Sequence, residues 1–222
     1  MKLDLNFLQK TFQGHADPKT AAGQKAYMKN HFEFLGIKTP VRRQLQKPFL
    51  KKEFVADPAR RKEVIDTLWS VQEREFQYFA QELIFTVKKK LEKEEIILIE
   101  KMVTQKSWWD TVDFIATKLA AQYFINYPEA IIPKIYQWLE SDNIWLIRTA
   151  ILFQLHYKEK TDIELLACII ESQYGSKEFF INKAIGWMLR QYSRTNPDWV
   201  RSFIESHDLQ PLSRREGGRL LN

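Results

Sequence analysis

Cysteine is almost absent from this sequence of 222 residues. Cys168 is the only one, and it lies in the apolar run LLACII. No disulfide can form within the chain, which favours a reducing compartment and a packing role for the thiol. Long apolar runs are missing too, and the N-terminal stretch MKLDLNFLQKTFQGH lacks the features of a signal peptide. We therefore expect a cytoplasmic protein with no membrane partner.

Sequence motifs for metal or nucleotide binding are also missing. The four histidines, at positions 15, 31, 156 and 207, form no HExxH pattern, and there is no CxxC pair. Neither a Walker loop nor a dinucleotide-binding loop occurs, and GxSxG is absent. We expect no metal, no nucleotide cofactor and no other cofactor.

Glycine is scarce, with 7 residues, and strand-like alternation is rare, which argues against a β-sandwich or a β-barrel. Apolar residues instead recur with the period of an α-helix from end to end. The helical segments are separated by short breaks, several of which place a polar residue before a proline, as at Asp17-Pro18, Asp57-Pro58 and Asn196-Pro197. The sequence predicts an all-α protein whose single domain covers residues 1–222.

Three of the helical segments look alike. An aromatic residue opens each one, in WDTVDFIAT, WLIRTAILF and FINKAIGWM, which start at positions 109, 145 and 180. Another amphipathic helix precedes each, over 92–103, 128–139 and 161–172. A helix pair about every 35 residues is typical of an α-solenoid, and a loose consensus favours HEAT-like repeats. Because such solenoids bind partners on a concave face, and the net charge is +6, we expect that face to be basic and to bind an anionic partner such as nucleic acid.

The segment SWWDTVD, residues 107–113, contains the main candidate site. Ser107 and Asp110 resemble a capping box, whereas Asp113 lies on the same helix face as Trp109. The repeat alignment turns Asp113, Arg148 and Trp187 toward one surface, and Arg148 of the next repeat can reach Asp113. Each residue also has a plain structural interpretation: an ordinary ion pair for Asp113 and Arg148, and core packing for the tryptophans. Trp108 is expected to be the core member of its pair.

Basic residues form a second set of candidates. GIKTPVRRQLQK, residues 36–47, predicts a helix with Thr39 as N-cap and Pro40 in its first turn. A helix start with nearby arginines suits a phosphate group. An ordinary solvated charged surface is the alternative. The candidate DNA contacts are Tyr27, Lys29, Thr39, Arg42, Arg43, Lys47, Lys183, Arg190 and Arg194.

Four stretches together resemble the AlkD family of bacterial DNA alkylation repair proteins. They are YMKNHFEFLGIKTPVRRQL, SWWDTVD, SDNIWLIRTAILFQL and KEFFINKAIGWMLR, and the resemblance runs from about residue 7 to residue 216. The C-terminal EGGRLLN is the part that matches least. The resemblance implies a HEAT-like fold and places the family's catalytic aspartate at Asp113, its site tryptophans at Trp109 and Trp187, and its arginine at Arg148. Tyr27 and Lys29 fall in the segment that helps to hold the duplex in the family.

The resemblance also implies an activity. The family excises cationic N3- and N7-alkylated purines, such as 3-methyladenine and 7-methylguanine, by hydrolysing the N-glycosidic bond without enclosing the base. The partner would be double-stranded DNA containing alkylated purines. A capped solenoid with a net positive charge is further expected to be a monomer. The alternative is a HEAT-like scaffold that binds DNA or another protein without chemistry.

Overall fold

The computed structural model describes residues 3–221, and within that range it is all-α: no strand occurs, only one isolated β-bridge between Glu33 and Glu73. The chain divides into two compact units, one up to Leu98 and one from Ile99 onward. Each is described by itself. The prediction of an all-α fold is confirmed, whereas the single domain over 1–222, the solenoid and its basic concave face stay predictions.

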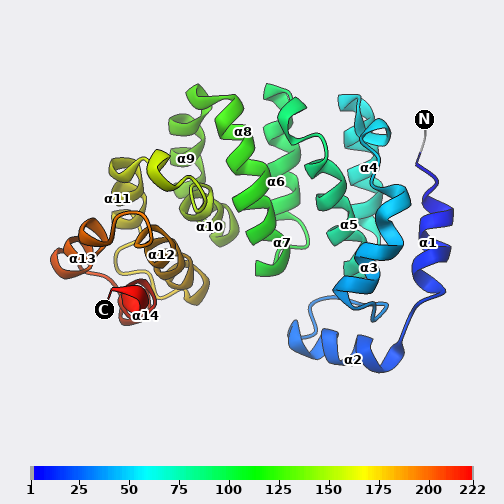
Figure 1. The fold of residues 1–222 in the computed structure, drawn as a ribbon, viewed down its shortest axis with the longest axis horizontal. Helices are drawn as coiled ribbons and strands as arrows, with labels where there is room; N and C mark the ends of the chain where they lie inside the picture. Colours follow the sequence, from blue (N-terminus) through cyan, green and yellow to red (C-terminus); the bar gives the residue numbers. More distant parts are fainter. Residues whose placement is uncertain (1–2, 222) are drawn as a thin grey trace. The chain divides into compact units, whose positions relative to one another are not determined.

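The first unit holds five α-helices among its described residues, with short 3-10 turns between them. Within it, α1 packs against α3, and α4 packs against α5 (Figure 1). The elements are α1 (Leu5–Gln13), α2 (Pro18–Tyr27), α3 (Thr39–Gln46), η1 (Lys47–Phe49), η2 (Lys52–Val55), α4 (Pro58–Ser70), α5 (Arg74–Phe85), η3 (Lys88–Lys90) and η4 (Lys93–Glu95).

The buried residues of the first unit explain its packing. Phe12 of α1 is fully buried and packs against Phe76 and Phe79 of α5, with ring centroids 5.3 and 6.4 Å apart. The loop between α2 and α3 is tied to α5 by Glu75, whose buried carboxylate accepts hydrogen bonds from the backbone amides of residues 35, 36 and 37. Gly36 is required in this loop, because its φ is +87° and a Cβ there would lie 2.1 Å from the carbonyl oxygen of Asp17.

The second unit consists of successive helices joined by short connections, and their arrangement as repeated pairs stays a prediction. The helix α6 (Ile96–Thr104), which contains the boundary, is followed by one long helix in three parts (Figure 1): α7 (Trp109–Phe114), the π-helical η5 (Ile115–Ala120) and α8 (Ala121–Asn126). The remaining elements are η6 (Pro128–Ala130), α9 (Ile131–Leu139), α10 (Ile144–Leu152), η7 (Lys158–Lys160), α11 (Ile163–Glu171), α12 (Phe179–Tyr192), α13 (Pro197–Ser206), α14 (Pro211–Gly217) and η8 (Gly218–Leu220).

The helix α10 is central to the second unit. It packs against α9 of its own pair and also against α7, η5, α11 and α12, while α12 makes its most extensive contacts with α14. Phe124 packs against Trp138 and Phe153, with ring centroids 5.5 and 5.0 Å away, and all three side chains are buried. This apolar cluster joins α8, α9 and the end of α10. The helix α10 in turn contacts α7 and α12, and these three helices carry the candidate site.

Several helix starts follow the predicted cap-and-proline pattern. The side chains of Asp17, Asp57 and Asn196 each accept a hydrogen bond from a first-turn amide, with proline as the first helical residue. Thr39 was predicted wrongly as an N-cap: α3 already includes it, and the residue before it, Lys38, makes no side-chain capping bond. The position is off by one residue because proline at 40 is compatible with either of the first two helical positions.

Candidate functional site

The turn before α7 determines where the two tryptophans point. Lys106 has a left-handed φ of 49°, and the Ser107 hydroxyl donates to the carbonyl of Val103 at the end of α6. Trp108 then has an extended backbone and stands as the residue before the helix. The predicted capping box of Ser107 and Asp110 is therefore wrong, because the serine closes the preceding helix instead of opening the next one. Trp109 becomes the first residue of α7.

The two adjacent tryptophans have different surroundings. Trp108 packs against Trp145 and Phe180, with ring centroids 5.6 and 5.0 Å away, and Trp145 and Phe180 are themselves 4.9 Å apart. These rings come from the turn before α7, from α10 and from α12, and they join the three elements. Trp108 thus packs against aromatic rings, but it is half-buried like Trp109 and is not part of the fully buried core that was predicted for it. Trp109 lines a pocket.

Arg148 and Asp113 form a two-point ion pair between α10 and α7. Nε of Arg148 donates to Oδ1 of Asp113 at 2.7 Å, and Nη2 donates to Oδ2 at 2.9 Å. Nη1 donates to the backbone carbonyl of Phe180 on α12. The predicted reach from Arg148 to Asp113 is confirmed. Since a guanidinium carries five N–H donors, these three bonds leave two for another acceptor.

The ion pair is sheltered but not sealed. The exposed fraction is 6% for the Arg148 side chain and 19% for that of Asp113. Burial raises the pKa of the Asp113 carboxyl above 3.8, and the hydrogen bonds and charge of Arg148 oppose that rise without cancelling it.

The π-helix η5 begins two residues after Asp113, at Ile115. The wider turn changes the backbone hydrogen-bonding pattern after α7, and the hydroxyl of Thr117 donates to the carbonyl oxygen of Asp113 at 2.7 Å. π-helical turns are often found at functional sites. No pattern in the sequence indicated this one.

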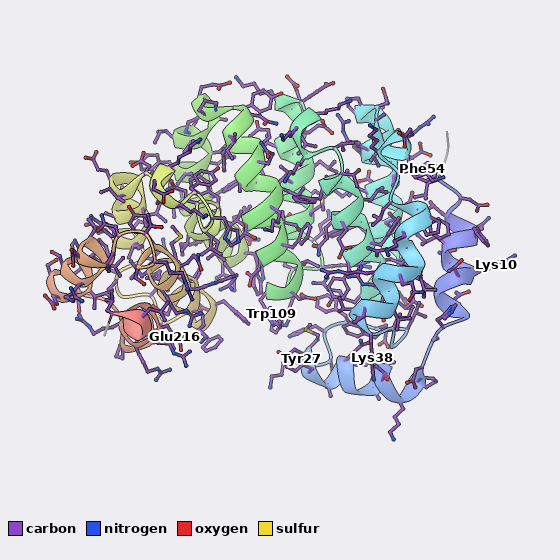
Figure 2. All side chains as sticks on the ribbon, viewed as in Figure 1. Lys10, Tyr27, Lys38, Phe54, Trp109 and Glu216 are labelled. Carbon is purple, nitrogen blue, oxygen red and sulfur yellow. The ribbon has the colours of Figure 1, made fainter. Side chains whose placement is uncertain are left out.

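A pocket of about 290 Å³ opens beside the ion pair, and it brings together Trp109, Arg148, Trp187, Lys183 and Arg190 from the predicted set. Asp113, which is bonded to Arg148, is not part of the lining. Arg194, two residues after the end of α12, is exposed and outside the lining. The lining also contains three residues that the sequence did not single out for the site: Phe179, Phe180 and Glu216. Figure 2 shows Trp109 at the start of α7 and Glu216 on α14.

A signal for two of these additional residues was present in the sequence. Phe179 and Phe180 are adjacent aromatics at the start of a helix, as Trp108 and Trp109 are. One of each pair packs inward, while Phe179 is 56% exposed at the pocket. Glu216 had no such signal, because it lies in the C-terminal stretch that matched the family pattern least.

The other candidate DNA contacts belong to the first unit. Tyr27 ends α2 and is 69% exposed (Figure 2). Lys29, two residues later, has a left-handed φ of 55°. Thr39, Arg43 and Lys47 are exposed on or directly after α3. These placements are compatible with contacts to a phosphate backbone, which stay a prediction.

Arg42 differs from its neighbours. It is only 4% exposed, and its guanidinium donates to Gln46 at 2.7 Å and to Glu82 of α5 at 2.9 Å. The amide of Gln46 also donates to Glu82. We correct the expectation that Arg42 contacts DNA: it faces the interior because it lies on the same side of α3 as Gln46, and it joins α3 to α5.

Two general features of the described residues bear on the range of possible sites. Within residues 3–221, no three His, Cys, Asp or Glu side chains lie close enough to hold a metal ion together. No helix in this range combines the length and the apolar character needed to cross a membrane.

Comparison with known proteins gives the family. The model of the family described as "DNA alkylation repair enzyme" matches residues 8–221. A solved structure from Enterococcus faecalis, titled a predicted DNA alkylation repair enzyme, is 37% identical with a TM-score of 0.87, over 93% of this chain and 96% of that one. A search of curated proteins gives no match. From the extent of the family match, the chain belongs to the DNA alkylation repair enzyme family.

Proposed function

We propose that this protein is a DNA glycosylase that removes cationic N3- and N7-alkylated purines from double-stranded DNA by hydrolysing the N-glycosidic bond. The observation that carries the proposal is the ion pair of Asp113 and Arg148 beside a pocket lined by Trp109 and Trp187. Membership of the DNA alkylation repair enzyme family supports it.

The residue types fit the demands of this reaction. An alkylated purine with a positive charge is a good leaving group, so the main need is to stabilise positive charge at the sugar as the bond breaks. The Asp113 carboxylate supplies negative charge for that purpose. Arg148 occupies one lone pair on each carboxylate oxygen, and each oxygen retains another that can hold the attacking water.

The tryptophans supply the surrounding surface. The indole faces of Trp109 and Trp187 are electron-rich and attract a cationic sugar, while their bulk excludes water from the reacting bond. The described residues that line the pocket include no Asn or Gln to recognise a base edge. We therefore propose that the site acts on the sugar, that the base is not flipped into it, and that no metal takes part.

Contacts to the DNA backbone complete the proposal. Two N–H donors of Arg148 remain after its three bonds, and Lys183 and Arg190 line the same pocket. These cations are suited to phosphates next to the lesion. In the first unit, Tyr27, Lys29, Thr39, Arg43 and Lys47 are the proposed backbone contacts. We further propose that the protein acts as a monomer in the cytoplasm.

A scaffold that binds DNA without chemistry is the second candidate. It is favoured by one observation: both oxygens of Asp113 are engaged by Arg148, and Asp113 is absent from the pocket lining. A carboxylate that only holds an arginine in place would look the same.

Release of free base separates the two candidates. Purified protein is incubated with duplex DNA that carries 7-methylguanine, and the free base and the abasic sites are quantified beside the Asp113→Asn variant. The glycosylase releases base, and the variant binds the duplex but releases base about 10²–10³-fold more slowly. Binding of the duplex without any base release by the unsubstituted protein would establish the scaffold instead.

A further inference from the structure

A buried carboxylate collects three cations at the edge of the pocket. Glu216 of α14 is only 7% exposed. Its Oε1 lies 3.2 Å from Nζ of Lys183, and its Oε2 lies 2.9 Å from Nη1 of Arg190 and 3.4 Å from Nη1 of Arg219. Lys183, Arg190 and Glu216 all line the pocket. An anion is unexpected on a surface proposed to face phosphates, so its presence needs a reason.

The packing of α14 on α12 places this carboxylate with little freedom. A Cβ on Gly186 would lie 2.5 Å from Cβ of Glu216, so only glycine permits the approach. The hydroxyl of Ser213 donates to the backbone and side-chain oxygens of Asn182 at 3.0 and 3.1 Å. A Cβ on Gly217 would lie 3.0 Å from Cβ of Leu189. Two glycines and a buried hydroxyl thus fix α14 at close range.

The two cations that Glu216 joins lie on one face of α12. Lys183 and Arg190 are two helical turns apart, a spacing that points both side chains the same way. Their like charges oppose a close approach, and a carboxylate bonded to both offsets that repulsion. Burial raises the pKa of the Glu216 carboxyl, but Lys183, Arg219 and Arg190 lower it by more, so that the net shift is downward. The acid is therefore ionised and pairs with them at neutral pH.

Both cations retain the capacity to bind a further anion. The Lys183 and Arg190 side chains are 39% and 29% exposed. An ammonium has three donors and a guanidinium five, so one bond from each to Glu216 leaves others for phosphate oxygens.

We propose that Glu216 is a positioning residue that holds Lys183 and Arg190 as a preformed two-point clamp for the DNA backbone at the pocket edge. This inference rests on the DNA-binding part of the proposed function and does not require base release. Restricting two long side chains before DNA arrives reduces the entropy lost on binding. The cost is one negative charge, which is kept away from the DNA by burial.

The test measures affinity for an undamaged, fluorescently labelled duplex over a series of salt concentrations. Glu216→Gln removes the charge with little change in shape, and Glu216→Asp keeps the charge but retracts it from the two cations. We expect both variants to bind about three- to tenfold more weakly. Glu100→Gln is the matched control, because Glu100 is also a sheltered carboxylate paired with a lysine, Lys134 at 2.9 Å, and it does not line the pocket.

A second measurement tests the coupling directly. Lys183→Met should weaken binding in the native chain and make the slope of log affinity against log salt shallower by about one unit. In the Glu216→Gln background the same substitution should cost less, because the clamp is already lost. With alkylated duplex and excess enzyme, the half-saturating concentration should rise in Glu216→Gln while the maximal rate of base release stays unchanged.

Several results would overturn the clamp. They are tighter binding by Glu216→Gln, unchanged binding by Glu216→Asp, or an equal cost of Lys183→Met in both backgrounds. If the Glu216 variants unfold, the test is made with Lys183→Met and Arg190→Met in the native chain. An unchanged salt dependence of binding in these variants would refute the clamp. Because the duplex is undamaged, a protein that shows the coupling but releases no base loses the glycosylase proposal alone. A protein that releases base without the coupling loses the clamp alone.

Discussion

Each of the two units buries an arginine that holds a carboxylate with two hydrogen bonds, yet the two pairs differ in what else the arginine does. In the first unit, Nε and Nη2 of Arg61 donate to Glu95, both at 2.6 Å. In the second, Nε and Nη2 of Arg148 donate to Asp113. The exposed side-chain fractions are 1% and 9% for the first pair, and 6% and 19% for the second.

The remaining donors show the difference. Arg61 gives its other N–H groups to the carbonyls of Val55, Ala56 and Lys90, so that all five are engaged within the protein. Arg148 has only one further bond, to the carbonyl of Phe180, and it lines a pocket. The Arg61–Glu95 pair, in which every N–H donor of the arginine is bonded within the protein, therefore stabilises the fold. In the Arg148–Asp113 pair, two N–H donors of the arginine remain for a ligand.

The largest effect expected from this comparison concerns Arg61. Replacing it by Met should lower the free energy of unfolding by about 3–5 kcal/mol, because Glu95 would be left buried and unpaired. Chemical denaturation followed by circular dichroism measures the loss. Base release per folded molecule should be nearly unchanged at low temperature. A variant as stable as the native protein would show that the sealed pair does not hold the fold.

Asp113→Asn should have the opposite profile. We expect base release to fall by about 10²–10³-fold, the range for removing one electrostatic contact to a reacting centre. The loss of stability should be smaller than that of Arg61→Met, since the pocket lets solvent reach Arg148. Single-turnover release of 7-methylguanine and a thermal melt provide the two numbers. If the melt shifts more than that of Arg61→Met while release persists, the two pairs have been assigned the wrong roles.

Arg148→Lys sharpens the comparison by keeping the charge. A lysine cannot bond both carboxylate oxygens and the Phe180 carbonyl as a fork and still reach a phosphate. We expect base release to fall by about ten- to hundredfold, together with weaker duplex binding. The same exchange at Arg61 should affect denaturation and leave duplex binding alone.

The smallest expected effect is on pH dependence. Since burial raises the pKa of Asp113, base release should fall as the pH drops through a value above 3.8, where the carboxylate becomes protonated. The sign for stability is reversed. A carboxyl whose pKa is higher in the folded state stabilises the fold below its unfolded pKa, and loses that contribution as pH rises through the folded value. Base release measured over the acid range tests the first effect, and denaturation of the native protein and of Asp113→Asn over the same range tests the second. A fall in base release centred on the ordinary aspartate pKa would contradict the raised value.

Much of the fold and part of the site could be predicted from the sequence. Helix periodicity and cap-and-proline breaks are local signals, and they gave correct starts at Asp17, Asp57 and Asn196. The alignment of repeated segments brought Arg148 to Asp113, because equivalent positions in packed helices lie a fixed distance apart.

The remaining features depend on contacts between distant residues. Arg42 looked like a phosphate ligand because nothing near it in sequence reveals Glu82, which binds it. Glu216 was missed because its role depends on Gly186 and Ser213, which bring α14 against α12. The raised pKa of Asp113 depends on how deeply the fold buries its carboxyl group, and the spacing of residues along the sequence does not give that burial.

The π-helix η5 between α7 and α8 has a consequence for how this chain tolerates length changes. A wide turn contains a residue more than the α-helical turn it replaces. Deleting a single residue from 115–120 is therefore expected to convert η5 to an α-helix and not to break the helix. The side chains on the two sides of η5 would then follow one regular α-helical repeat. Asp113 and the buried Phe124 would then no longer face their present neighbours together. The one extra residue in η5 thus lets the same helix bury Phe124 and hold Asp113 beside Arg148.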